Sequence, residues 1–173
     1  MNPFRTIPTL AAAGLFCLAV AAPLAHAGHL NTVLEAQLNG REEVPSDGSR
    51  ALAGDPDGRA EAYVFGIDSD KTTLCYVLVG VKKIDELTMA PGNGRAAHIH
   101  RGARGTNGPV VVNLAWPQDG QAGDCLREDT AGKFTNVTVQ EILSNPTGFY
   151  VNIHNSVYPS GAIRGQLGYS TSD

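Results

Sequence analysis

The sequence RAEAYVFGI at positions 59–67, followed by DSDK at 68–71 and TTLCYVLVGV at 72–81, decides the fold class. In the first run small side chains alternate with larger ones, which is typical of a strand with two different faces. The second run is strongly β-prone. The short polar segment between the two runs is a turn signal. Together the three pieces predict a strand, a tight turn and a second strand.

The same alternation of strand and turn continues in both directions along the chain. Segment 136–143 favours one or two turns of helix over a strand, and Asn145-Pro146 ends it. No long amphipathic helix is predicted. The sequence therefore predicts an all-β domain: an antiparallel Greek-key or immunoglobulin-like β-sandwich, or a barrel, with one short helix. Further strands are predicted at 32–38, 95–100, 109–116, 147–155 and 162–169, and loops at 41–58, 82–94 and 117–132.

The first 27 residues have the three parts of a secretory signal peptide. Arg5 gives a positive start, positions 10–23 are apolar, and Ala25-His26-Ala27 has the small-x-small form of a cleavage site. The apolar run is too short and wrongly flanked for a stable membrane span. We expect removal of residues 1–27, a single domain over 28–173, and a periplasmic or extracellular location with no membrane span.

Two cysteines remain once the predicted signal peptide, which holds Cys17, is removed. In an oxidising compartment the isolated pair Cys75 and Cys125 favours one disulfide over two free thiols. The sequence has no Cys-x-x-Cys motif, and no histidine lies close in sequence to either cysteine. Both facts argue against thiol catalysis.

Charge and motif content exclude several classes of function. The chain has 13 Lys and Arg against 17 Asp and Glu, a net charge of −4, with no basic cluster interleaved with aromatic residues. Nucleic acid is therefore not an expected partner. The sequence has no Ser-His-Asp order, no paired-carboxylate motif and no phosphate-binding loop. Hydrolytic and transferase chemistry have no support from these patterns.

Three of the five histidines lie in two short motifs, AHIHRG at 97–102 and NIHN at 152–155. Residues i and i+2 of a strand point to the same face, so His98 and His100 present two imidazoles side by side. In the strand at 147–155, alternation separates an apolar core face from a polar face. The core face holds Phe149, Val151 and Ile153, and the polar face holds Tyr150, Asn152 and His154.

Pairing of this strand with 95–100 would bring His98, His100 and His154 together on one polar face. Three neutral imidazoles suit a copper ion, or zinc as the alternative. The other ring nitrogen of each ligand needs a partner, for which Asn152 and Asn155 are candidates. Binding should weaken as the pH falls through about 6, because only neutral imidazole binds a metal.

Simpler interpretations of the same residues remain open. The histidines can hydrogen-bond to the backbone or to a neighbouring Asn and form a polar seam without metal. Arg164 either supports the site from nearby or makes a structural ion pair or carbonyl cap. His29 lies next to the predicted mature N-terminus, where the terminal amine and the imidazole would form a weaker, secondary chelate.

The chain resembles the CHRD (chordin) domain family in its single-domain microbial exported form. The segment AQLNGREEVP at 36–45 is similar to the opening of that domain, and AHIHRG at 97–102 and YPSGAIRGQ at 158–166 continue the likeness. The resemblance covers nearly all of the mature chain. It implies an all-β, immunoglobulin-like module of poorly defined function, which in the animal protein is part of a binder of growth factors.

A fainter resemblance links the chain to Cu/Zn superoxide dismutase. His98-Ile99-His100 looks like the His-x-His pair of that enzyme, and Arg164 looks like its late arginine. Besides these, only His29 and His154 remain in the mature chain, too few for a dinuclear site. A mononuclear copper site is the most that the sequence supports.

Three functions from different classes follow. The first is exported metal binding through His98, His100 and His154, with copper as the expected ion. The second is a superoxide dismutase-like redox enzyme at the same site. The third is a metal-free module for adhesion or for binding an unidentified protein or small ligand. We favour binding over catalysis, because the sequence displays no assembled proton or electron path.

Overall fold

The computed structural model describes residues 32–49, 51–82 and 97–170. The predicted signal peptide over 1–27, His29 and nearly all of the predicted loop at 82–94 lie outside these ranges. No helix within the described ranges is both long and apolar enough to traverse a lipid bilayer.

The described residues form nine strands and one short α-helix, so the prediction of a mostly β fold with one helix is confirmed. Three short 3-10 helices, η1 (Gly40–Glu42), η2 (Gln118–Gly120) and η3 (Pro146–Gly148), and the helix α1 (Val139–Ser144) lie between strands. The strands are β1 (Val33–Asn39), β2 (Arg59–Ile67), β3 (Asp70–Lys82), β4 (Ala97–Arg101), β5 (Val110–Asn113), β6 (Ala122–Arg127), β7 (Phe149–Ile153), β8 (Ile163–Gln166) and β9 (Gly168–Tyr169).

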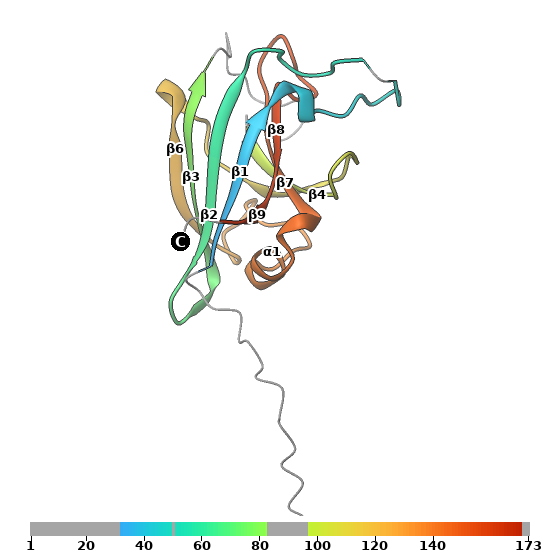
Figure 1. The fold of residues 1–173 in the computed structure, drawn as a ribbon. Coiled ribbons are helices and arrows are strands. Elements are labelled where there is room, and N and C mark those ends of the chain that lie inside the picture. The colour runs from blue at the N-terminus through green and yellow to red at the C-terminus, as the bar shows by residue number, and fades with distance from the viewer. Residues whose placement is uncertain (1–31, 50, 83–96, 171–173) are drawn as a thin grey trace, which may run out of the picture.

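All nine strands belong to one antiparallel sheet, in the order β5-β4-β7-β8-β1-β2-β3-β6, with β9 paired to β1. The sheet curls, so that β1, β2, β3 and β6 form one wall and β8, β7 and β4 the other (Figure 1). The two walls join where β1 meets β8, at the pair Asn39 and Arg164. The predicted two-sheet sandwich is therefore wrong in its layering: the fold is a single curled sheet. Alternating burial is the same in both architectures, so the sequence pattern could not separate them.

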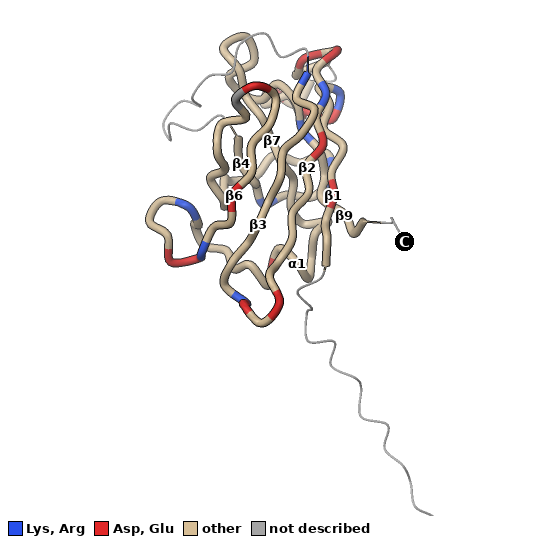
Figure 2. Tube along the Cα trace, turned by 90° about the vertical axis from the view of Figure 1, so that its left-hand side faces the viewer, with Lys and Arg blue, Asp and Glu red and all other residues tan. Residues whose placement is uncertain are grey.

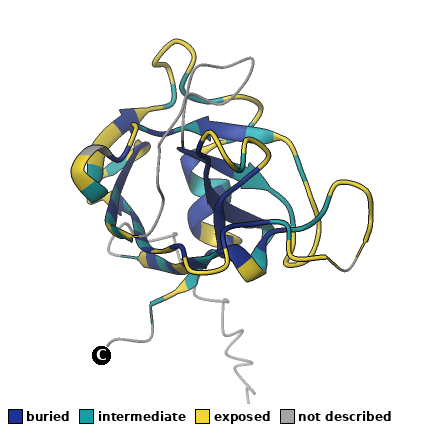
Figure 3. Ribbon diagram, turned by 90° about the horizontal axis from the view of Figure 1, so that it is seen from above, coloured by how far each residue is buried: buried dark blue, intermediate teal, exposed yellow. Residues whose placement is uncertain are grey.

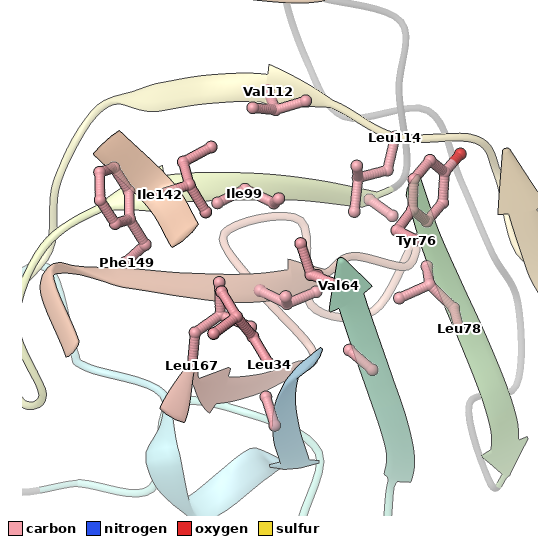
Figure 4. Close-up of a cluster of buried hydrophobic side chains, with 14 of the residues drawn as sticks. Leu34, Val64, Tyr76, Leu78, Ile99, Val112, Leu114, Ile142, Phe149 and Leu167 are labelled. Atoms are coloured by element: carbon pink, nitrogen blue, oxygen red, sulfur yellow. The ribbon is translucent and has the colours of Figure 1, made fainter. Parts of the chain in front are cut away.

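The hydrophobic core fills the inside of the curled sheet (Figure 4). Alternate residues of β1, β2 and β3, among them Leu34, Val64 and Leu78, point inward and are fully buried. Ile99 and Phe149 approach them from the opposite wall. The outward residues of β1 and β2 are half-buried or exposed, which explains the period of two in the sequence.

Helix α1 closes one end of this core. Thr138 caps its N-terminus, because the side-chain oxygen accepts a hydrogen bond from the Glu141 backbone N–H at 3.1 Å. The helix buries Val139, Ile142 and Leu143 and ends at Asn145. The helix begins at Val139 rather than at the predicted residue 136, because Thr138 is its N-cap.

Strand β7 is buried on both faces. Val151 and Ile153 face the core, as predicted, while Tyr150 and Asn152 lie on the opposite face and are also buried. Loops cover that second face, and in Figure 3 the exposed loops surround the buried strands. A polar layer is therefore enclosed between the outer face of β4, β7 and β8 and the loops. This layer contains the candidate site.

A disulfide joins Cys75 of β3 to Cys125 of β6, as predicted. The two residues are directly opposite each other in the strand pair. Cys125 does not lie in a loop, so the predicted loop at 117–132 is wrong over β6. This edge strand is polar and mostly exposed, and its extended form comes from backbone pairing with β3 rather than from an apolar pattern.

Replacing Ile153 by Ala should lower the free energy of unfolding by roughly 2–5 kcal/mol, because the side chain is fully buried in the core. Ile67, 40% exposed on β2, provides the matched control, and Ile67→Ala should cost much less. Chemical denaturation measures both changes. Equal losses in the two variants would contradict the assignment of the core face.

Removing the disulfide with Cys75→Ala and Cys125→Ala should cost on the order of 3–5 kcal/mol, because the bond closes a long loop in the unfolded chain. Without reductant, the folded protein should have a mass two hydrogens below that of the dithiol form. Two alkylatable thiols in the folded protein would contradict the bond.

Candidate metal centre

Three imidazoles meet in the buried polar layer. His98 and His100 lie on β4, and His154 follows the last residue of β7. The pairing of His98 with Asn152 and of His100 with Tyr150 puts all three rings on one face of the sheet. Each ring offers a nitrogen, and the three nitrogens lie within 4.8 Å of one another. Within the described ranges, these three histidines are the group of metal-ligating side chains that lie close enough together to hold one metal ion.

Backbone carbonyls fix the tautomers of two of the rings. His154 Nδ1 lies 3.0 Å from the Pro159 carbonyl oxygen, and His100 Nδ1 lies 2.9 Å from that of Gly108. A carbonyl only accepts, so both Nδ1 atoms carry the proton, and in the neutral ring the lone pair is at Nε2. The His100 Nε2 is buried and has no hydrogen-bond partner among the described residues. This is the arrangement that metal-binding histidines adopt.

His98 completes the cluster through its Nδ1 atom. That atom lies 3.2 Å from His154 Nε2, and the two rings meet edge to face with centroids 5.0 Å apart. Because His154 Nε2 holds a lone pair, His98 Nδ1 donates the proton between them. Two nitrogens bound tetrahedrally to one copper or zinc ion are about 3.3 Å apart. An ion could therefore take the place of this proton with little movement of either ring, the His98 proton passing to the other ring nitrogen, Nε2, so that the ring remains neutral.

Burial favours the uncharged form of the rings. His98 and His154 are buried, and His100 is half-buried. Loss of solvent lowers the pKa of His100 to about 4, and it also lowers the pKa of His154. For His100 and His154 the neutral imidazole, which is the metal-binding form, is thus the form present near pH 7.

Tyr150 supports His100 from the neighbouring strand, a role that the sequence analysis did not assign. The two rings stack with centroids 4.8 Å apart and planes 10° apart. On the Tyr150 ring lies the Arg164 guanidinium, 3.4 Å from the centroid. The Tyr150 hydroxyl accepts a hydrogen bond from the Gly108 backbone N–H at 3.2 Å. Tyr150 therefore contacts both His100 and the residue whose carbonyl holds it.

Arg164 acts as a clamp on backbone carbonyls, which was one of its open interpretations. It is 2% exposed and donates to the carbonyl oxygens of Ala103 at 3.2 Å and Thr106 at 2.8 Å. These bonds hold the loop that carries Gly108. Arg164 thus supports His100 indirectly, through this loop and through the ring of Tyr150.

The two asparagines that the sequence predicts as partners of the histidine nitrogens form hydrogen bonds to other groups. Asn155 Oδ1 accepts a hydrogen bond from the Tyr158 backbone N–H at 2.6 Å and shapes the turn that places Pro159. Asn152 Nδ2 donates to Glu43 Oε2 at 3.2 Å. Backbone carbonyls from the covering loops replace the amides as partners of His100 and His154. Sequence spacing does not reveal such contacts.

Glu43 is a further site residue that the sequence analysis did not assign. Its side chain enters the polar layer from the segment after η1, and the residue is 8% exposed. Burial raises its pKa to about 8, although the charge of Arg164 and the Asn152 hydrogen bond both act to lower it. Gly161 makes room for it, because a Cβ there would lie 2.6 Å from Glu43 Oε2. The only signal in the sequence was the position of Glu43 in the motif at 36–45.

Comparison with known proteins gives a family but no individual relative. No curated protein and no solved structure matches the chain. Residues 34–167 match the family model of the CHRD domain. That range begins in β1 and ends after β8, and it includes the three histidines, the disulfide and Arg164. The protein therefore belongs to the CHRD domain family.

Proposed function

We propose that this protein is an exported metal-binding protein that holds one copper ion through His98, His100 and His154. The observation that carries the proposal is the orientation of the rings. Two carbonyls fix the Nδ1 protons of His100 and His154, so that their Nε2 lone pairs are available within the cluster. The buried and unpartnered Nε2 of His100 is the atom that an ion would satisfy.

The ligand chemistry favours copper, with zinc as the alternative. Imidazole suits both ions, and divalent copper binds a given set of nitrogen ligands more tightly than zinc does. The described cysteines are joined in the disulfide and supply no thiolate. Three neutral nitrogens leave a fourth position for water or a small ligand.

The protein would act in an oxidising compartment, either the periplasm or the extracellular space. The disulfide is consistent with such a compartment. The predicted signal peptide over 1–27, followed by a single domain, provides the route of export.

A metal-free binding module is the alternative, and one hydrogen bond within the cluster supports it. The His98–His154 hydrogen bond is complete without an ion. It leaves His100 Nε2 without a partner, however, and this favours the metal-binding interpretation. Among the described residues one such cluster is found, so the two-metal centre of Cu/Zn superoxide dismutase is not proposed, and a redox enzyme at this same site is the remaining alternative.

Calorimetric titration with copper and zinc should reveal one tight site per chain. Loss of a direct ligand should weaken binding more than the roughly tenfold to hundredfold effect of losing a supporting residue. His98→Ala and His154→Ala should therefore each cost more than that, whereas His29→Ala should remove only a weaker, secondary site. Equal affinity in the wild type and in the His98→Ala/His154→Ala double variant would leave the metal-free module as the function.

The pH at which the ion is released should be lower than for free imidazole. At the imidazoles themselves, protons compete with the metal as the pH approaches the pKa of each ring, and burial lowers the pKa of His100 to about 4. Bound metal should therefore persist as the pH falls below about 6, where the sequence alone predicts weakening. Equilibrium dialysis across this range measures it, and release centred near pH 6.5 would contradict the effect of burial.

A further inference from the structure

Glu43 is a buried acid that the proposed metal ligation does not use. Asn152 binds one of its oxygens, and the other, Oε1, has no hydrogen-bond partner among the described residues. Glu43 also lies in the lining of a cleft of about 280 Å³. The cleft is lined by residues 43–47, 49, 51 and 53 together with Ser160 and Gly161. The acid therefore lies between an opening to solvent and the buried polar layer.

Asn152 connects Glu43 to the histidine cluster. Its amide contacts Glu43, and in the sheet it is directly opposite His98. The Asn152 Oδ1 also lacks a partner. A protonated Glu43 would supply the missing hydrogen-bond donor, because its acid O–H can donate to Asn152 Oδ1. The two orphaned oxygens thus point to a protonated acid.

Among the residues that the structure describes, few titratable or charged groups face Glu43. Arg164 is the cation that favours its ionised form, and Tyr150 and Asn152 are neutral neighbours. Asp47 lines the outer part of the cleft, and its carboxylate accepts a bond from the Ser49 backbone N–H. Burial outweighs the attraction to Arg164 and raises the pKa of Glu43 to about 8. Near pH 7 the acid is therefore mostly protonated.

We propose that Glu43 is the charge-compensating acid of the metal site, which gives up its proton to the cleft when a divalent ion binds to the histidines. This inference rests on the proposed function. A divalent ion adds two positive charges to a layer that already contains Arg164 and three neutral rings. Nearby positive charge favours the carboxylate over the acid. The exchange is balanced: one ion enters, one O–H bond of Glu43 ionises, and one proton leaves to solvent through the cleft.

By linkage, the same exchange makes metal affinity depend on pH. Where one proton is released per ion, the dissociation constant falls up to tenfold for each unit of rise in pH. The release by Glu43 fades as the pH rises through about 8, because the acid is then ionised before the ion arrives. A metal-bound water behaves in the opposite way, since its proton release grows as the pH rises through its own pKa.

The test is the number of protons released per bound ion. Calorimetry with Zn²⁺ and with Cu²⁺, on the protein as exported, is repeated at about pH 7 in buffers of different ionisation enthalpy. Wild type should release close to one proton more per ion than Glu43→Gln, which mimics the protonated acid. Glu42→Gln is the matched control, because Glu42 pairs with Arg104 and should leave the release unchanged.

A pH series on the wild type tests the inference independently of any variant. Proton release should fall between about pH 6.5 and about pH 9. Release that rises over this range, or equal release from wild type and Glu43→Gln at full metal occupancy, would overturn the role of Glu43 and leave the metal site intact. Failure of the wild type to bind either ion would overturn the proposed function and this inference together.

Discussion

The antiparallel register of β4 and β7 is the constraint on which the core and the candidate site both depend. It sets Ile99 opposite Val151 on the inside and His98 opposite Asn152 on the outside. A shift of one residue would exchange the two faces and place imidazoles in the apolar core. The cost of that exchange fixes the register strongly. The stability of the core therefore determines the positions of His98 and His100.

Loops cover the candidate site and supply the carbonyl groups that orient two of its histidines. The outer face of β4, β7 and β8 is polar, and it is buried because segments before β2, after β4 and after β7 lie over it. The loop after β4 brings the Gly108 carbonyl to His100, and the turn after β7 brings the Pro159 carbonyl to His154. Arg164 holds the first of these loops. Loop carbonyls thus orient His100 on β4 and His154 just after β7, whereas His98 on β4 is oriented by its hydrogen bond to His154.

Features that depend on the period of two could be predicted from the sequence, and those that depend on distant contacts could not. The core face of β7 and the shared face of His98 and His100 follow from alternation alone. The curled single sheet could not be distinguished from a sandwich, because it differs only at the junction of β1 with β8. Glu43 was missed because its partner Asn152 lies 109 residues away. Strand β6 could not be predicted from its polar side chains, because its extended form comes from backbone pairing with β3.

The bond between Cys75 and Cys125 has a consequence for the resistance of the protein to proteolysis. Among the described strands β6 lies at the end of the sheet, where it pairs with β3 alone, and it is largely exposed (Figure 2). Such an edge is the natural place for the chain to peel away and enter the active site of a protease. A covalent link in the middle of the β3–β6 pair prevents peeling from continuing past it. Resistance to digestion is then governed by rare opening of the whole sheet rather than by fraying of its edge.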